Sequence, residues 1–374
     1  MMMDPPAKIG ATIDEIDTPA LIVDLDAFDR NIAKMAGYVA SKNIALRAHA
    51  KTHKSSAVAR RQMKAGAVGQ CVQKVGEAEA LVRAGIGDVL VTNQIVGAEK
   101  LNRLAKLAHH AAIGLCFDDP LQIRAASDAA TREGVTLAGY VEIDTGMARC
   151  GVKPGQSAAE LAQLIANAKG LSFKGIQAYH GSAQHLPTAA ERRAAIAQAI
   201  ASVKDTQVAL AGIGLLAQAV TGAGTGTYRI EAESGIYTEL QAGSYAFMDV
   251  DYAVIKDESG HDYSEFEHSL FVLSTIMSVA GDHWVVADAG LKSYSGEKGP
   301  PRIHQWPGLA VVSLSDEHGK IDVAPGAKRP ALGEKLFLIP GHCDPTINLH
   351  NWYVGVRNGR VEEIWDIDAR GASR

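Results

Sequence analysis

The sequence predicts an α/β protein, a (β/α)8 TIM-type barrel followed by a mainly antiparallel β domain. Its 374 residues exceed the roughly 250 of one such barrel by about the size of a small second domain. Hydrophobic residues make up 47% and charged residues 21%, which is typical of a chain that buries a large core. Short apolar runs alternate with Ala-rich helical stretches over the first two thirds of the chain, and this alternation indicates parallel strands joined by crossovers.

The predicted barrel spans residues 20–255. Between its apolar runs the spacing of hydrophobic residues changes to the helical period, as in Val75–Ala84 and Ala158–Ala168. Eight such units favour a closed barrel over an open sheet. The expected strands are Ile44–His49, Ala67–Val72, Asp88–Thr92, Ile113–Phe117, Leu137–Ile143, Phe173–Tyr179, Leu215–Thr221 and Glu239–Gly243.

The predicted β domain spans residues 256–374 together with residues 1–19. No long helical pattern interrupts this part of the chain, and turn-rich segments separate its apolar runs. The segment Ile9–Pro19 is expected to add a strand. The other expected strands are Phe266–Met277, His283–Asp288, Leu309–Ser313, Glu334–Ile339, Asn351–Arg357 and Arg360–Ile367.

Charge and composition exclude several classes of protein. The net charge is −5 and no basic run occurs, so nucleic acid is not an expected partner. No stretch reaches the ~18 apolar residues of a membrane span. Residues 1–10 lack the apolar core of a secretory signal. The four cysteines are widely spaced without a CxxC pair, which indicates reduced thiols and a cytoplasmic location: Cys71, Cys116, Cys150 and Cys343.

Polar residues follow the predicted barrel strands at one end, where the reactive groups of such barrels lie. Glycine-rich loops with Thr or Ser, as after the seventh and eighth strands, are typical of phosphate sites, and equally of tight turns. A lysine at a strand end, such as Lys51, can form a Schiff base because desolvation lowers its pKa. The alternative is that Lys51 is an ordinary surface lysine. That interpretation fits Lys54 better than Lys51. A phosphate site and a buried lysine together suggest pyridoxal phosphate.

A second candidate site is the pair His342 and Asp344, which follows a predicted strand. In extended backbone, positions i and i+2 face the same side, and Pro345 favours extended backbone at Asp344. Cys343 would then point away. Imidazole and carboxylate suit Mn²⁺, Co²⁺, Mg²⁺ or Zn²⁺, although a hydrogen-bonded turn without metal would show the same pattern.

Four segments, in this order, resemble the alanine-racemase-like fold of pyridoxal-phosphate enzymes, and most closely its branch of D-threonine aldolases and D-serine dehydratases. The resemblance covers essentially the whole chain. The dehydratases of this branch are similar but carry histidine and cysteine at the i and i+2 positions of the metal pair, whereas this chain has its cysteine at i+1. The segments are Thr18–Asp24, Arg47–Lys54, Asp144–Gly151 and Pro340–Thr346.

The resemblance implies a role for each matching residue. Lys51 matches the lysine that bonds covalently to the cofactor, and Arg149 an arginine beside its phenolic oxygen. Tyr179 and His185 match active-site residues, His185 as the base near the substrate hydroxyl. Gln241 falls where a residue meets the pyridine nitrogen. The residues that fall where the family holds the phosphate are Gly224, Thr225, Gly243, Ser244 and Tyr245.

The implied function is retro-aldol cleavage of D-3-hydroxy-amino acids, for example of D-threonine to glycine and acetaldehyde, with pyridoxal phosphate and a metal on His342 and Asp344. The alternatives are a dehydratase of D-serine or D-3-hydroxyaspartate, an amino-acid racemase, a non-catalytic pyridoxal-phosphate-binding protein, and a barrel without cofactor. The resemblance also implies a homodimer. Trp352, Tyr353 and Trp365 are candidates for its interface, and equally for the core of the β domain.

Overall fold

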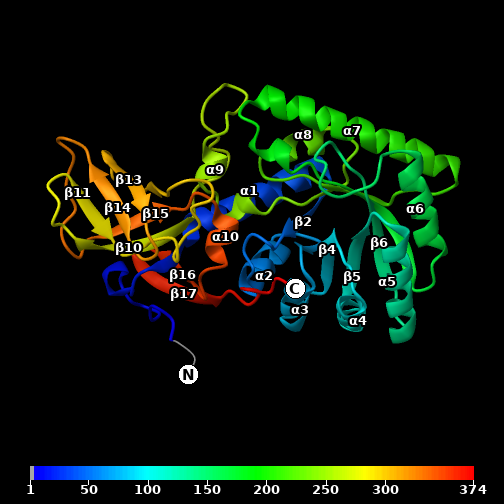
Figure 1. The fold of residues 1–374 in the computed structure, drawn as a ribbon, viewed down its shortest axis with the longest axis horizontal. Helices are drawn as coiled ribbons and strands as arrows, with labels where there is room; N and C mark the ends of the chain where they lie inside the picture. Colours follow the sequence, from blue (N-terminus) through cyan, green and yellow to red (C-terminus); the bar gives the residue numbers. More distant parts are fainter. Residues whose placement is uncertain (1–3) are drawn as a thin grey trace.

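Eight parallel strands close into a barrel in the computed structural model, which describes residues 4–374 (Figure 1). Residues 1–3, which were expected to accompany the second domain, lie outside the described residues. Each strand pairs with the next, and β9 returns to β2 with Glu239 opposite Ala45, which confirms the predicted barrel. The strands are β2 (Ala45–His49), β3 (Gly69–Val72), β4 (Asp88–Gln94), β5 (Ala112–Phe117), β6 (Leu137–Glu142), β7 (Leu171–Ala178), β8 (Ala219–Gly222) and β9 (Glu239–Leu240).

Helices cover the outside of the barrel (Figure 1). Their buried faces are rich in Ala, Leu, Ile and Val at helical spacing, and these faces pack on the strands. They are α1 (Leu25–Lys42), α2 (Ser56–Lys64), α3 (Val75–Arg83), α4 (Ala98–Leu107), α5 (Pro120–Glu133), α6 (Gln156–Asn167), α7 (Ala189–Gly212) and α8 (Tyr228–Glu233). Short helices η2 (Ser182–His185), η3 (Ser244–Ala246) and α9 (Val250–Ala253) occupy loops after β7 and β9.

A nine-stranded sheet lies beside the barrel (left in Figure 1). All of its strand pairs are antiparallel except β1 with β16, which confirms the mainly antiparallel second domain. Helix α10 (Cys343–Ile347) lies between β15 and β16 in the chain. The strands are β1 (Ala20–Asp24), β10 (Leu270–Ser278), β11 (Trp284–Ala287), β12 (Arg302–Ile303), β13 (Leu309–Leu314), β14 (Gly319–Val323), β15 (Lys335–Ile339), β16 (Trp352–Arg357) and β17 (Arg360–Asp366).

The start of the chain differs from the prediction. The strand expected at Ile9–Pro19 is wrong, because that segment holds only the short helix η1 (Ile13–Glu15) and one isolated bridge from Thr12. The first strand of the chain is β1, which begins at Ala20, directly after the expected segment. It lies in the second sheet between β10 and β16, so the prediction that the barrel begins at residue 20 is also wrong. Residues 20–23 of β1 are apolar and buried, as a central strand requires. The division between residues 255 and 256 stays a prediction.

One hydrophobic cluster joins the barrel to the second sheet. It contains Leu46 and Leu240 from barrel strands together with Val272 and Leu338 from the sheet. Tyr353 is fully buried, and its ring stacks on Phe247 with centroids 5.5 Å apart. This shared core fixes the sheet against the barrel end.

The aromatic residues that were candidates for an interface belong to this core. Tyr353 and Trp365 are 0% and 6% exposed, and Trp352 is half-buried, so the interface interpretation of Tyr353 and Trp365 is wrong.

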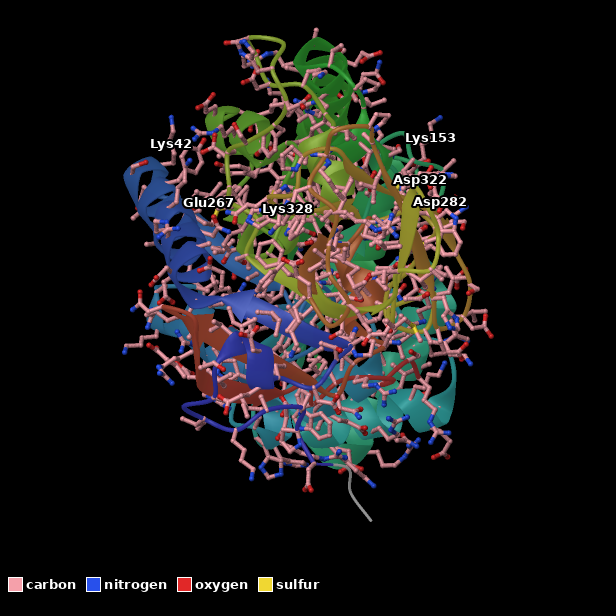
Figure 2. All side chains as sticks on the ribbon, turned by 90° about the vertical axis from the view of Figure 1, so that its left-hand side faces the viewer. Lys42, Lys153, Glu267, Asp282, Asp322 and Lys328 are labelled. Atoms are coloured by element: carbon pink, nitrogen blue, oxygen red, sulfur yellow. The ribbon has the colours of Figure 1, made fainter. Side chains whose placement is uncertain are left out.

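The surface of the second sheet carries charges of both signs. Figure 2 views the molecule from this end, and its labelled side chains include Asp282, Asp322 and Lys328. Among residues 4–374, no helix has the length and apolar character needed to cross a bilayer.

A buried charge pair closes the barrel near the start of its strands. Arg47 in β2 is nearly buried, and its Nε lies 3.1 Å from the Glu239 carboxylate in β9. Its Nη1 lies 2.5 Å from Asp88, the first residue of β4. Because Glu239 is also nearly buried, each of these two charges depends on the other.

Substituting Arg47→Met should lower the free energy of unfolding by about 3 kcal/mol, because it leaves the Glu239 carboxylate buried without its cation. Urea-induced unfolding measures the change. Arg30→Met is the matched control, because the Arg30–Glu267 pair is exposed, and it should cost under about 1 kcal/mol. Equal losses in the two variants would contradict a role for the buried pair.

Candidate active site

A cavity of about 250 Å³ opens at the barrel mouth. Its walls come from the ends of the parallel strands and the loops after them, where barrel enzymes carry their reactive groups. Eight residues line the cavity, and four of them were predicted as site residues: Lys51, Arg149, Tyr179 and Gln241. The other four were not predicted, although they lie at or near the ends of strands: His49, Gln73, Thr92 and Gln177.

His49 belongs to a polar network on one wall. Gln73 donates from Nε2 to the Thr92 hydroxyl (3.0 Å), and the same Nε2 lies 3.0 Å from His49 Nε2. Burial, helped by the positive charge of Lys51, holds the pKa of His49 well below its usual value. His49 is therefore a neutral imidazole at pH 7, with the Lys51 backbone N–H 3.4 Å from its Nδ1 and the Gln73 amide nitrogen 3.0 Å from its Nε2.

Gln241, the residue after β9, belongs to a second polar network in this cavity. Its Nε2 donates to Gln177 Oε1 (2.7 Å) and to the Thr221 hydroxyl (2.8 Å), and Thr221 in turn donates to Glu239. The Gln241 amide is thus held by Gln177 and Thr221, and Thr221 is held in turn by Glu239. Because both hydrogens of this amide are engaged, only its oxygen can still meet a ring nitrogen, as an acceptor, and the amide carries no charge that would keep the nitrogen protonated.

Lys51 and Asp344 meet at the mouth although 293 positions separate them in the chain. Lys51 Nζ lies 2.6 Å from Asp344 Oδ2. The Lys51 side chain is 38% exposed and that of Asp344 13%. The contact brings the candidate cofactor lysine to the candidate metal pair.

The ion pair sets the charge of both groups. Burial disfavours the charged form of Lys51, but the Asp344 carboxylate outweighs it and raises the pKa of Lys51 above its usual value. The expectation of a lowered pKa is therefore wrong for this arrangement. For Asp344, burial is likewise outweighed by the charge of Lys51, which lowers the pKa of the carboxyl.

The turn that carries His342 and Asp344 is not an extended strand end. His342 has extended backbone and caps α10, but Asp344 and Pro345 lie inside this short helix. Proline fits the first turn of a helix because the N–H that it lacks would have no partner there, so the extended backbone expected at Asp344 is wrong. The two side chains still converge, with His342 Nε2 4.0 Å from Asp344 Oδ1. Cys343 is fully buried.

These two side chains fit one metal ion. An imidazole nitrogen and a carboxylate oxygen 4.0 Å apart are donors of the kind that divalent ions take. Glu297 holds His342 at Nδ1, which leaves Nε2 for the ion and reproduces the carboxylate–histidine–metal arrangement of many sites. No group of three or more His, Cys, Asp or Glu side chains within residues 4–374 is arranged as a complete ligand set. A metal here would need water or substrate as further ligands.

His185 lies in η2, after β7. Its Nδ1 is 3.1 Å from Asp251 Oδ2, and its ring is 5.0 Å from that of Tyr252. Lys298 Nζ lies 3.4 Å from the same Asp251 oxygen. Burial lowers the pKa of His185, and although the Asp251 carboxylate opposes this, the positive charges of Lys298 and Lys51 reinforce it. His185 is therefore neutral at pH 7 and can accept a proton.

Tyr179 and Arg149 form another part of the cavity wall. The Arg149 guanidinium lies 5.7 Å from the centre of the Tyr179 ring, within the range of a cation–π contact. The loop that carries Arg149 is shaped by Asp144, whose Oδ1 accepts backbone N–H groups from Gly146, Met147 and Ala148. No role was predicted for Asp144, although an Asp two residues before a Gly is typical of such turns.

The loop between β8 and α8 has the features of an anion site. The Thr225 hydroxyl is buried and has no hydrogen-bond partner in the described part of the chain, so it is available to a bound group. Gln184 buttresses the loop: its Oε1 accepts the Gly226 N–H, and its Nε2 donates to Thr227 Oγ1. A Cβ at Gly224 would lie only 2.5 Å from Gln184 Oε1, so glycine is required there. The orphaned hydroxyl and the close backbone approach fit a phosphate.

The loop after β9 completes this side of the barrel. A Cβ at Gly243 would lie 2.7 Å from the His49 carbonyl oxygen, which explains the glycine. Ser244 is buried at the start of η3. Tyr245 is fully buried, and its hydroxyl accepts a hydrogen bond from Gln62 in the core, so its side chain serves packing.

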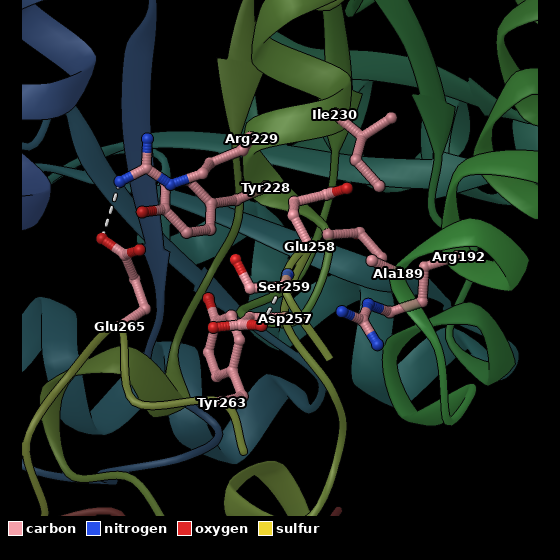
Figure 3. A pocket seen from close by; sticks show the side chains of 12 residues that line it. Ala189, Arg192, Tyr228, Arg229, Ile230, Asp257, Glu258, Ser259, Tyr263 and Glu265 are labelled. Atoms are coloured by element: carbon pink, nitrogen blue, oxygen red, sulfur yellow. Dashed lines mark hydrogen bonds and ion pairs between the residues drawn. The ribbon is translucent and has the colours of Figure 1, made fainter. Parts of the chain in front are cut away.

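A separate cavity of about 290 Å³ borders the same β8–α8 loop at Gly226 and Thr227 (Figure 3). Arg229 and Glu265 form an ion pair of 2.7 Å at its edge. Arg192 donates to backbone carbonyl groups of Leu186 and Pro187. None of the predicted site residues lines this cavity, so it is distinct from the one that holds Lys51.

Family models match most of the chain. Residues 23–250 match the model "Alanine racemase, N-terminal domain", and residues 269–356 match the model "Putative serine dehydratase domain". These two ranges correspond to the segment from β1 through the barrel and to most of the second sheet.

Individual proteins match over the full length. The chain is 47% identical over 372 residues to a 3-hydroxy-D-aspartate aldolase from Paracoccus denitrificans (strain Pd 1222), covering 98% of this chain and 96% of that protein. It is 44% identical over 372 residues to a D-threonine aldolase from Arthrobacter sp., covering 100% and 97%. Among solved structures, that of a D-threonine aldolase from Filomicrobium marinum superimposes with a TM-score of 0.96 at 46% identity, covering 99% of this chain and 100% of that one.

Fold, order of motifs and full-length similarity agree: the chain belongs to the alanine racemase-like family, alongside the D-threonine and 3-hydroxy-D-aspartate aldolases.

Proposed function

We propose that this chain is a lyase that uses pyridoxal 5'-phosphate and a divalent metal ion to cleave D-3-hydroxy-amino acids between Cα and Cβ, as in the conversion of D-threonine to glycine and acetaldehyde. The observation that carries the proposal is the 2.6 Å contact between Lys51 and Asp344, which joins the candidate cofactor lysine to the candidate metal pair. Relatives named as aldolases, 44–47% identical over the whole chain, support it.

Bound pyridoxal phosphate supplies an electron sink for the pair released when the Cα–Cβ bond breaks. Lys51 would bond to its carbonyl carbon, Arg149 and Tyr179 would line its phenolic side, and Gln241 would meet its ring nitrogen. The residues that would hold its phosphate are Gly224, Thr225, Gly243, Ser244 and Tyr245.

His342 and Asp344 would hold the metal ion, and Mn²⁺ is the proposed ion because an imidazole and a carboxylate suit it; Mg²⁺, Co²⁺ and Zn²⁺ are the alternatives. The metal would supply Lewis acidity, which would favour ionisation of the substrate β-hydroxyl. His185, neutral at pH 7, would accept the hydroxyl proton. Asp251, whose Oδ2 lies 3.1 Å from Nδ1 without a hydrogen bond between the two atoms, would stabilise the imidazolium that forms through its charge.

A dehydratase of D-serine or D-3-hydroxyaspartate is the second candidate function. The match of residues 269–356 to a dehydratase domain favours it. The order of the metal pair argues against it, because the dehydratases of this branch place a cysteine where this chain has Asp344. Cys343 itself is fully buried beside the pair.

We also propose a homodimer and a cytoplasmic location. Val96, on the loop after β4, and Leu121, in the first turn of α5, are 70% and 67% exposed and line one cavity, an apolar surface that a partner subunit could cover. Sedimentation of an active monomer would contradict the dimer. All four cysteines are free thiols, as expected in a reducing compartment.

The direct test is product analysis. Purified protein with pyridoxal phosphate and Mn²⁺ should convert D-threonine to glycine and acetaldehyde, should leave L-threonine unchanged, and should lose this activity on chelation and regain it with Mn²⁺. Formation of a 2-oxo acid and ammonia from D-threonine or D-serine would instead assign the dehydratase function.

Lys51→Ala should abolish the visible absorption of the protein-bound cofactor imine and the cleavage activity, because it removes the amine that bonds to the cofactor. Absorption spectra before and after borohydride reduction measure this. Lys64→Ala, an exposed position at the end of α2, is the control and should retain both. A yellow, reducible Lys51→Ala protein would move the assignment to Lys54, which the structure pairs with Glu77.

Thr225→Val should have opposite effects on the protein with and without cofactor. Without cofactor it removes a buried hydroxyl that lacks a partner, so the free energy of unfolding should rise by about 1 kcal/mol. With cofactor it removes a hydrogen bond to the phosphate, so the dissociation constant should rise about tenfold. Thermal unfolding and fluorescence titration measure the two effects, and exposed Thr136→Val should show neither. Unchanged cofactor affinity would place the phosphate elsewhere.

A further inference from the structure

Asp249 is a fully buried carboxylate to which neither the resemblance nor the proposed chemistry gives a role. It lies after η3, where the barrel chain crosses to the second sheet. Its Oδ1 accepts the backbone N–H of Tyr252 (3.0 Å), and its Oδ2 accepts the backbone N–H of Cys343 (2.9 Å). One carboxylate therefore holds two segments of the site.

The Cys343 N–H belongs to the peptide that joins His342 to Cys343, at the start of α10. The first N–H groups of a helix have no partner within the helix, so an outside acceptor decides how this turn is held. Two backbone bonds run alongside: Val250 N–H donates to the Pro340 carbonyl (3.1 Å), and Asp251 N–H donates to the Gly341 carbonyl (3.0 Å). The Asp249–Cys343 bond continues this row of hydrogen bonds between residues 249–251 and residues 340–343. It therefore lies at the turn that carries the His342 and Asp344 side chains.

The Tyr252 N–H belongs to α9, which Asp249 caps. This short helix carries Asp251, 3.1 Å from His185 Nδ1, and Tyr252, whose ring lies 5.0 Å from that of His185. The same carboxylate thus fixes the neighbours of His185 and the turn of the metal pair.

We propose that Asp249 is a positioning residue, which holds the His342–Asp344 pair in register with His185 by accepting the Cys343 and Tyr252 N–H groups with its two oxygens. It contacts neither the ion nor the substrate. The proposal rests on the proposed function, because it gives Asp249 a purpose only if a metal ion binds at His342 and Asp344.

Replacing the carboxylate by an amide separates this role from packing. An asparagine has one acceptor oxygen, and its NH₂ group would face the second N–H donor, so one of the two bonds is lost at nearly constant volume. Asp249→Ser tests the other arrangement: serine is a good helix cap and can keep the Tyr252 bond, but it is too short to reach Cys343. Loss of such supporting contacts typically weakens metal sites about 10–100-fold.

The test is an electron paramagnetic resonance titration of the cofactor-loaded protein with Mn²⁺. Asp249→Asn and Asp249→Ser should each raise the Mn²⁺ dissociation constant at least about tenfold while leaving the cofactor absorption unchanged. Asp119→Asn, a helix-capping aspartate at the start of α5, is the matched control and should leave Mn²⁺ affinity unchanged. Asp344→Ala should abolish the site.

The outcomes separate the inference from the function on which it rests. Wild-type affinity in both Asp249 variants, with binding lost in Asp344→Ala, overturns the positioning role and leaves the metal site standing. Mn²⁺ affinity that Asp344→Ala does not change overturns the metal site itself. Should both Asp249 variants fail to fold, amide exchange of the ¹⁵N-cysteine-labelled wild-type protein decides: the Cys343 amide should be protected, and fast exchange overturns the proposal.

Discussion

The docking of the second sheet on the barrel end is the constraint on which the candidate site depends. Barrel strands, the loop after β9 and the sheet contribute to one hydrophobic cluster, in which Phe247 stacks on Tyr353. Strand β1 pairs with both β10 and β16, so the start of the barrel chain is built into the sheet. Because these contacts are apolar and extensive, α10 has a fixed place over the barrel mouth. Only that placement brings Asp344 within 2.6 Å of Lys51.

Charge balance explains why these two residues meet. A poorly solvated carboxylate such as Asp344 needs a positive partner, and in the structure the Lys51 ammonium fills that role. If Lys51 bonded to a cofactor, it would no longer offer a free ammonium group, and the carboxylate would need another cation. A divalent ion beside His342 would supply one at the same place, with the imidazole already oriented by Glu297. The Lys51 ammonium and the proposed metal ion therefore meet the same need, a positive charge beside the Asp344 carboxylate.

Local patterns predicted much of this protein, and contacts between distant segments account for the rest. Apolar periodicity identified the strands of the barrel, and the position of polar residues after strand ends brought Lys51 and Tyr179 to one cavity. The pattern could not show that β1 leaves the barrel, because pairing with β10 and β16 depends on segments 250 and 330 residues away. Nor could it show the raised pKa of Lys51, which Asp344 causes from the other domain. His49 was visible as a strand-end residue, but its hydrogen bond with Gln73 was not.

The turn at His342 also shows how one position could divide the reactions of this branch. His342 caps α10 and Asp344 lies in its first turn, so both side chains reach the barrel mouth, while Cys343 between them is fully buried and its N–H bonds to Asp249. A cysteine at position 344 would present a thiolate beside Lys51, which is a softer ligand that favours Zn²⁺. A carboxylate there favours a harder ion with exchangeable water, suited to polarising a hydroxyl that stays on the departing aldehyde. In this helical turn, position 344 carries the side chain that lies 2.6 Å from the Lys51 ammonium, so the residue at this position would decide which ion the proposed pair prefers.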